Sequence, residues 1–157
     1  MSVLSGEITY KEVERMKVST RGRYAIRVML DLAEHDQTEY IPLTDIAKRQ
    51  EISEKYLEAI VSMLVKAGLL TALRGKRGGY KLTRTPEHYT LKDILEITEG
   101  DFAPVSCLES EVNNCSRASE CKTLKVWTDF RKLVYDYFDG ITLESLLGDA
   151  GCLDYSI

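Results

Sequence analysis

Two amphipathic stretches joined by a very short connection constrain the fold of this chain more than any other feature. Residues 42–50 have the apolar spacing of a short helix, and residues 51–53 are brief enough to form a turn. Ser53 is placed to cap a longer second helix, and Gly68 is typical of the position just after a helix. This arrangement predicts a helix-turn-helix, with these residues on the apolar face of the second helix: Leu57, Ile60, Val61, Leu64 and Val65.

The opposite face of the second helix and the segment after it suit nucleic acid. That face carries short or polar side chains able to approach base edges: Glu54, Lys55, Glu58, Ala59 and Ser62. Residues 69–73 and 80–83 have strand character, and the cationic, glycine-rich sequence RGKRGG lies between them. A basic hairpin directly after a helix-turn-helix predicts a wing, whose glycines admit phosphates closely and whose arginines can enter a minor groove. Each part alone also fits ordinary core or surface, but their order favours nucleic-acid binding.

Four further helices are expected, over residues 20–34 with Thr20 as N-cap, 90–99 with Thr90 as N-cap, 121–138 and 141–147. The third of these has a wide apolar stripe, made of Leu124, Trp127, Phe130, Leu133, Val134, Tyr137 and Phe138. Such a helix either lies deep in the chain's own core or buries its surface against a second copy. The preceding elements offer little surface to cover it, so we expect a homodimer.

The resulting fold class is mainly α with a small β-hairpin: a winged helix-turn-helix plus a long C-terminal dimerisation helix. We expect an extension over 1–15, the DNA-binding domain over 16–85, a sensing loop and dimerisation helices over 86–147, and a flexible tail over 148–157. Residues 16–85 carry 13 Lys and Arg against 8 Asp and Glu, whereas residues 86–157 carry 6 against 14. A basic half joined to an acidic half is consistent with one face that meets a polyanion, although surface variation alone could produce it.

Composition and targeting signals favour a cytoplasmic location. No apolar run approaches the roughly 18–20 residues that span a bilayer, and residues 1–15 lack the features of a signal peptide. We expect double-stranded DNA and a second copy of the chain as partners, and neither a membrane nor a small-molecule substrate. No catalytic constellation is found: there is no histidine–nucleophile pairing, no phosphate-binding P-loop motif and no metalloprotease motif, so an enzyme is not expected.

Three of the four cysteines, Cys107, Cys115 and Cys121, lie in one polar run with seven and five residues between them. A disulfide does not suit a reducing compartment, and zinc usually takes a tighter pair of cysteines. A reversible thiol switch is a third reading. An iron–sulfur cluster is favoured, because thiolates spaced along a wrapping loop can surround it, and Cys121 lies near the start of a helix whose dipole favours thiolate.

The segments MKVSTRGRYAIRVMLDLA, ISEKYLE, LRGKRGGYKL, TLKVW and ITLESLL resemble the IscR-type iron–sulfur cluster regulators, a bacterial winged-helix family whose relatives include NsrR and CymR. The resemblance runs from Met16 to Leu147. It implies a dimer with crossing C-terminal helices and a cluster that controls which DNA is bound. We expect Cys107, Cys115 and Cys121 to hold this cluster, and we favour [2Fe–2S] over [4Fe–4S], although the sequence leaves the nuclearity open.

The resemblance assigns DNA contacts as well. In IscR-type regulators the recognition helix reads bases through residues that match Ser53, Lys55, Tyr56, Glu58 and Ala59 here. The wing arginine that matches Arg74 enters the minor groove, and we expect Lys76 and Arg77 beside it to contact DNA. Glu58 matches an acidic residue that separates two classes of site. Ala59 stands where a glutamine is common, which leaves the base preference at that contact open.

The fourth cluster ligand is open. In IscR it is a histidine three residues after the last cysteine, where this chain has Leu124. Remaining candidates are Glu109, Glu111, Glu120, Cys152, a group from the partner chain or a small external ligand; His35 and His88 match no ligand position. The alternative function is a CymR-like regulator of cysteine or sulfur metabolism, which acts through a protein partner or a thiol switch without a cluster.

Overall fold

A computed structural model describes residues 17–35, 38–110 and 112–148 of the chain. Within these residues the elements are α1 Thr20–Glu34, α2 Leu43–Gln50, α3 Glu54–Lys66, β1 Leu70–Leu73, β2 Gly79–Leu82, α4 Leu91–Glu99, α5 Leu124–Asp139 and α6 Leu143–Gly148. Three short 3-10 turns complete them: η1 Pro86–His88, η2 Ser106–Leu108 and η3 Ala118–Glu120. The expected fold class, mainly helical with one antiparallel hairpin, is therefore confirmed.

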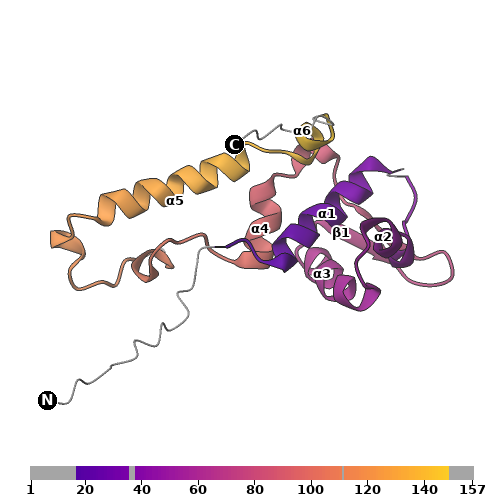
Figure 1. Ribbon diagram of the computed structural model, residues 1–157, viewed down its shortest axis with the longest axis horizontal. Coiled ribbons are helices and arrows are strands. Elements are labelled where there is room, and N and C mark those ends of the chain that lie inside the picture. Colours follow the sequence, from indigo (N-terminus) through magenta and orange to yellow (C-terminus); the bar gives the residue numbers. More distant parts are fainter. Residues whose placement is uncertain (1–16, 36–37, 111, 149–157) are drawn as a thin grey trace, which may run out of the picture.

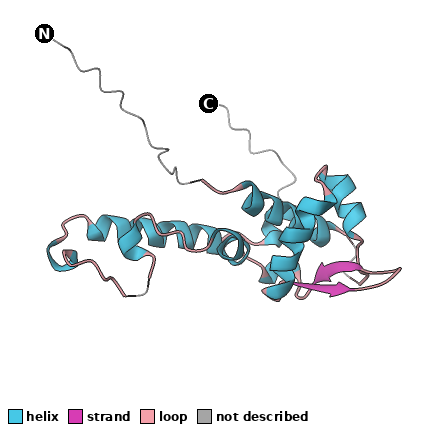
Figure 2. Ribbon diagram, turned by 90° about the horizontal axis from the view of Figure 1, so that it is seen from below, coloured by secondary structure: helices cyan, strands magenta, loops and turns pink. Residues whose placement is uncertain are grey.

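Figure 1 shows how these elements are distributed in space. The helices α1–α4 and α6 gather with the hairpin at one end of the molecule, while α5 extends away from them as an arm. The chain between α4 and α5 runs back along that arm, so the hairpin and this loop lie at opposite ends in both views (Figures 1 and 2).

Local side-chain signals begin the helices close to where the sequence predicts. Thr90 caps α4 in a complete capping box: its side chain accepts from the Asp93 backbone N–H, and the Asp93 carboxylate accepts from the Thr90 N–H. The prediction for α1 is wrong by one residue, because Ser19 rather than Thr20 is the N-cap. Ser19 has an extended backbone, and its hydroxyl accepts a hydrogen bond of 3.2 Å from the Gly22 N–H. Helix α5, which forms the arm, begins later than expected, at Leu124, and Cys121 lies outside it.

The turn between α2 and α3 is as short as the sequence predicts. Glu51 ends α2 in the left-handed region with φ 55°, and Ile52 follows it into the core, where it is 7% exposed. The Ile52 N–H donates to the Ala47 carbonyl, which satisfies a free carbonyl at the end of α2. Buried Ile52 and backbone bonds from the Glu51 and Ile52 N–H groups to the Ala47 carbonyl therefore help to hold the turn.

The hairpin is anchored at its base and extends free of the helices at its tip. Leu70 pairs with Leu82 and Leu73 with Gly79, and the Ile41 backbone forms a further bridge to Tyr80. A side chain at Gly79 would overlap the Ile41 carbonyl, so only glycine admits this third strand-like segment. Tyr89 is fully buried below the base, and its hydroxyl donates to the Leu69 carbonyl at 2.9 Å. The wing is thereby fixed to the helical core.

Helix α1 is the centre of the core and packs against α2, α3, α4 and α6. Its inner face carries the side chains that the helical period predicts, with Ala25, Val28 and Met29 at 0% exposure and Leu32 at 2%. Burying an aliphatic side chain of this size contributes about 1.5–3 kcal/mol, so this one face is a large part of the fold's stability.

Helix α5 contributes no fully buried side chain to this core. Val126, Leu133 and Tyr137 are 57%, 66% and 64% exposed, and Trp127 is 39% exposed. Of the two explanations for its apolar stripe, burial deep in the chain's own core is therefore wrong for these residues. The opposite side of α5 does pack inward, where Phe138 meets Phe102 with ring centroids 5.4 Å apart.

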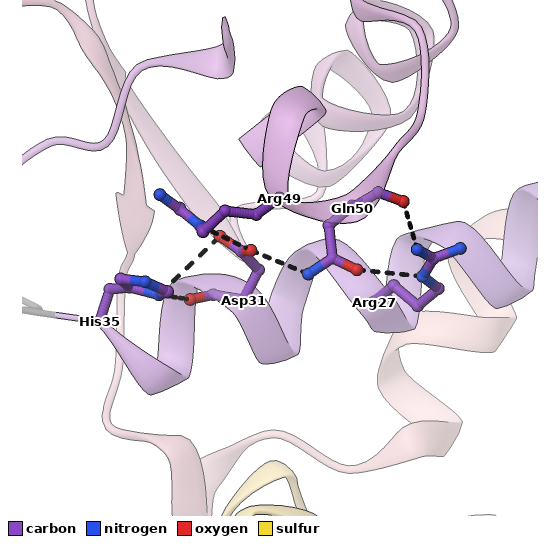
Figure 3. Close-up of polar contacts among 5 residues, drawn as sticks. All are labelled: Arg27, Asp31, His35, Arg49 and Gln50. Carbon is purple, nitrogen blue, oxygen red and sulfur yellow. Dashed lines mark hydrogen bonds and ion pairs between the residues drawn. The ribbon is translucent and has the colours of Figure 1, made fainter. Parts of the chain in front are cut away.

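A buried carboxylate joins α1 to the end of α2 (Figure 3). Asp31 is 1% exposed, and it accepts hydrogen bonds from Arg49 Nη2 at 2.5 Å, Arg49 Nε at 3.0 Å and Gln50 Nε2 at 2.8 Å. Burial raises the pKa of Asp31, but the hydrogen bonds from Arg49 and Gln50 outweigh it and hold the pKa below its usual value. His35 lies beside this group, with Nδ1 2.6 Å from the Asp31 carbonyl oxygen.

Replacing the buried carboxylate tests this joint. We expect Asp31→Asn to lower the free energy of unfolding by about 1–3 kcal/mol at pH 7, since charged hydrogen bonds are lost. The pKa of Asp31 is depressed in the folded chain, so this stabilisation is present above about pH 4 and is lost as the pH falls through the folded-state pKa. Urea unfolding at pH 7 and at lower pH should show the difference between the two proteins shrinking.

The matched control is Asp129→Asn, which breaks the exposed pair between Asp129 and Lys125. Its effect should stay within about 0.5 kcal/mol at every pH, because exposed ion pairs contribute little. An Asp31→Asn protein as stable as the wild type throughout would contradict the assigned role.

Candidate nucleic-acid interface and cysteine loop

The outer face of α3 presents the expected base-contacting residues to solvent. The structure places all of the following on exposed positions at the N-cap or in the first two turns of α3: Ser53, Lys55, Tyr56, Glu58 and Ala59. On the other side of α3, Leu57, Ile60 and Val61 are buried, with at most 1% of each residue exposed. The apolar contact of α3 with α1 and α2 thus decides which side chains face outward.

The wing tip gathers three cations on a short glycine-rich turn. Arg74, Lys76 and Arg77 are all exposed between β1 and β2. Gly75 has φ +109°, and the Gly78 N–H donates to the Gly75 carbonyl at 2.9 Å. A side chain at Gly78 would crowd backbone atoms of the same turn. Because two residues of this turn have no side chain, the turn occupies little space, and phosphates could come close to its three cations.

The cysteine loop connects α4 to α5. Cys107 lies in η2 and is half-buried, whereas Cys115 and Cys121 are exposed, and all three are free thiols. Within the described ranges 17–35, 38–110 and 112–148, no three His, Cys, Asp or Glu side chains lie together as a group able to hold a metal ion. Among the candidate fourth ligands, Glu109 and Glu120 border short turns of this loop, and Glu111 and Cys152 lie outside the described residues.

The surroundings of the Cys121 thiol lower its pKa from the usual value. A hydrogen bond from the Thr123 hydroxyl, 3.5 Å from Sγ, is the main cause that lowers its pKa, and the backbone N–H groups of Thr123 and Leu124 add to it. The charge of Arg117 acts in the same direction. Cys121 lies three residues before the first residue of α5, and the Thr123 hydroxyl makes the largest contribution to its lowered pKa.

Two carboxylates near the start of the loop bind other helices: one binds the N-cap of α1 and the other binds α5. The Glu99 carboxylate, at the end of α4, accepts from the Ser19 N–H at 3.0 Å and from the Ser19 hydroxyl at 2.6 Å. Two residues later, the Asp101 carboxylate pairs with Arg131 and accepts from the Tyr135 hydroxyl at 3.1 Å on α5. Gly100 joins them with φ +80° and ψ −144°, a conformation open essentially to glycine alone. The loop therefore begins at a fixed joint between α1 and α5.

Sequence reasoning did not assign any role to Glu99, Asp101 or Arg131. Glycine between two acidic residues at a helix end was the only available signal, and it reads equally well as an ordinary helix stop. The partners lie 80 and 30 positions away along the chain, so only packing brings them together.

Residues 18–149 match the Rrf2 family, described as iron-dependent transcriptional regulators. This chain belongs to that family. It is 38% identical to protein rrf2 of Nitratidesulfovibrio vulgaris over 135 residues, which cover 86% of this chain and 89% of that relative. It is 37% identical to the HTH-type transcriptional regulator IscR of Aliivibrio salmonicida over 134 residues, which cover 85% of this chain and 79% of that one.

Among solved structures, CymR, the global cysteine regulator of B. subtilis, is similar with a TM-score of 0.69 and 34% identity. The similarity covers 87% of this chain and all of CymR. The Rrf2 family and these relatives are transcription regulators, which confirms the expected resemblance, the winged-helix fold and the expectation that the chain is not an enzyme. In the part of the chain described here, no helix combines the length and apolar character needed to cross a membrane.

Two single-charge substitutions in the wing of this Rrf2-family regulator separate its expected contacts. Arg74→Ala should lower DNA affinity and bring the affinity ratio between duplexes with narrow and ordinary minor grooves toward one. Lys76→Ala should weaken all sequences alike and reduce the slope of log affinity against log salt by about 1. Fluorescence anisotropy titrations at several salt concentrations measure both effects.

Lys125→Ala on α5 removes the same charge from the opposite end of the molecule, in an exposed pair with Asp129. Its affinity and salt slope should match those of the wild type. Equal losses for all three variants would mean that net charge, and not the wing, sets the affinity.

Proposed function

We propose that this Rrf2-family transcription regulator binds a pseudo-palindromic DNA site as a homodimer and senses iron–sulfur cluster status through Cys107, Cys115 and Cys121. One observation carries the proposal. Three free thiols share a single loop, and that loop starts at a joint held by α1 of the DNA-binding half and by α5. A change in the loop therefore has a short physical route to the DNA-binding helices.

Binding to DNA would use α3 and the wing together. Ser53, Lys55, Tyr56, Glu58 and Ala59 would face base edges and phosphates in the major groove. Arg74 would enter the adjacent minor groove, while Lys76 and Arg77 would neutralise phosphates. The exposure of all eight side chains and the basic charge of residues 16–85 support this assignment.

The exposed face of α5 supports the homodimer. Val126, Phe130, Leu133 and Tyr137 follow one another at steps of four, three and four residues, which places them on one side of the helix. Three of them are more than half exposed, an unfavourable arrangement for a monomer in water. A second copy packed along this stripe would cover it and set two recognition helices about 34–36 Å apart, one turn of DNA.

Leu133→Glu tests the dimer. Placing an unpaired carboxylate at the centre of the stripe should weaken dimerisation at least about 100-fold, because burying such a charge costs several kcal/mol. Sedimentation equilibrium measures this. Lys125→Gln makes the same change in net charge on the neighbouring face and should leave the dimer intact. A wild-type protein that is monomeric at micromolar concentration would refute the assignment.

The donor set fits an iron–sulfur cluster in its chemistry, because cysteine thiolates are the ordinary ligands of such clusters. The described loop would have to gather its three thiols, since it holds no preformed metal group. A bound cluster supplies an iron centre that responds to oxidants, nitric oxide and iron supply. We favour [2Fe–2S] over [4Fe–4S], with the fourth ligand open between Glu109, Glu120 and groups outside the described residues.

The chain's own residues would convert loop order into DNA affinity. Asp101 holds the start of the loop on α5, and Glu99 holds the end of α4 on the N-terminus of α1. A loop arrangement that shifts Glu99 or Asp101 would change how α1 or α5 is held, and with it the spacing of the two wings. A tenfold change in DNA affinity needs a difference of only about 1.4 kcal/mol between the two arrangements.

The similarity to CymR supports a second candidate. In that case the exposed thiols of Cys115 and Cys121 act as a thiol switch, or the chain senses sulfur metabolism through a protein partner, without a cluster.

Anaerobic purification from iron-fed cells decides between the two. We expect coloured protein with bound iron and sulfide, and a DNA affinity that changes when the iron is removed. Cys107→Ala, Cys115→Ala and Cys121→Ala should each lower the iron content and remove that change, whereas Ser116→Ala, at an exposed position of the same loop, is the control that should retain both. If the wild type and all variants are colourless and their DNA affinity does not depend on iron, the cluster proposal is refuted and the CymR-like function is favoured.

A further inference from the structure

Besides the buried Asp31, two more side chains of α1 lie on the side that faces the turn between α2 and α3. Tyr24, Arg27 and Asp31 are spaced by three and four residues, so they lie in a row along that side. Asp31 holds the end of α2, as described above. Figure 3 shows Arg27 in the same row, directed at Gln50. The sequence analysis gave no role to Tyr24 or Arg27.

Arg27 binds both the backbone and the side chain of the last residue of α2. Its Nε donates to Gln50 Oε1 at 3.0 Å, and its Nη2 donates to the Gln50 carbonyl oxygen. Its guanidinium also lies over the Tyr24 ring, 5.4 Å from the centroid. The planar fork of arginine makes these contacts at once, which a lysine could not do.

Tyr24, which contacts Arg27, also contacts the proposed recognition helix α3. Its ring meets the ring of Tyr56 edge to face, with centroids 5.6 Å apart and planes at 84°. Tyr24 is partly buried against the core, so its own ring is held in place. Tyr56 is the third residue of α3 and is 41% exposed. An exposed tyrosine ordinarily samples several rotamers, and the fixed ring beside it restricts that freedom.

We propose that Tyr24 and Arg27 are positioning residues for DNA binding, which hold the Tyr56 ring and the α2–α3 turn in the arrangement that presents the first turn of α3 to DNA. Neither residue has to touch DNA for this. The inference rests on the proposed role of α3 as the recognition helix. Its energetic basis is preorganisation: a side chain already fixed in its bound orientation loses less entropy when it binds.

A double-mutant cycle tests the link between the two rings. Tyr24→Leu keeps apolar volume at the partly buried position and removes the ring edge, and Tyr56→Ala removes its target. The probe is a duplex selected by the wild-type protein from a pool of random sequences. Tyr24→Leu should weaken binding about 2- to 12-fold, the range expected for an aromatic pair, and should have little further effect in the Tyr56→Ala background. Effects that multiply fully would overturn the proposal.

Two further comparisons exclude a merely structural role. Tyr24→Phe retains the ring and should restore affinity to within about twofold of the wild type. Tyr24→Leu removes no cation, so its salt slope should equal that of the wild type. Thermal melting followed by circular dichroism checks that each variant is folded at the temperature of the titration.

Arg27 has a matched control on the same helix. Arg23 is also exposed and carries the same charge, but among the described residues its side chain bonds only to Thr20, one turn away. Arg27→Gln should weaken binding about 2- to 5-fold more than Arg23→Gln, because only Arg27 holds Gln50 and Tyr24. Equal losses would reduce Arg27 to a surface charge and overturn its part of the proposal, and this comparison remains decisive if Tyr24→Leu does not fold.

The failure of this inference differs from the failure of the proposed function. If α3 does not read DNA, Lys55→Ala and Glu58→Ala will leave affinity and sequence preference unchanged. If α3 reads DNA but the positioning is wrong, those two variants will alter binding while Tyr24→Leu and Arg27→Gln behave like the wild type.

Discussion

The bond between one buried carboxylate and the end of α2 holds the helix-turn-helix of this regulator together. Asp31 is almost fully enclosed and remains charged there only because Arg49 and Gln50 donate to it. These two donors are the last residues of α2, so the bond determines where the turn to α3 begins. The start of α3 thus depends on a polar contact at the end of α2, while the burial of its inner face depends on apolar packing against α1 and α2.

Helix α1 receives contacts from both functional parts of the molecule. On one side it holds the helix-turn-helix through Asp31 and Arg27, and at its N-terminus it is held by Glu99 from the end of α4. A side chain at Gly22 would meet the Glu99 carboxylate, which would then have to shift away from its place at the N-terminus of α1. The cysteine loop and the wing lie at opposite ends of the molecule, and α1 contacts both β2 of the wing and α4, which precedes the loop. The proposed sensing would use this contiguous set of contacts.

The arm formed by α5 has a different physical basis. Its inner side is fixed by the Asp101–Arg131 pair and by the packing of Phe102 on Tyr135 and Phe138. Its outer side leaves an apolar stripe in water, where each uncovered side chain forgoes about 1.5–3 kcal/mol of burial. A single chain therefore covers only the inner side of this helix. For this reason we propose that a second copy covers the outer side.

The sequence by itself determined the helices, the hairpin and the outward face of α3, because these follow from residue spacing and capping over a few positions. It also placed the three cysteines on one loop and the three cations on one turn. It misplaced the α1 cap by one residue, since Ser19 and Thr20 are equally good caps locally. Only the tertiary structure decided that Ser19 binds Glu99, that Asp101 binds Arg131, that Tyr24 meets Tyr56 and which side of α5 stays exposed. These contacts join residues far apart along the chain, and their geometry depends on how whole helices pack, which local periodicity does not encode.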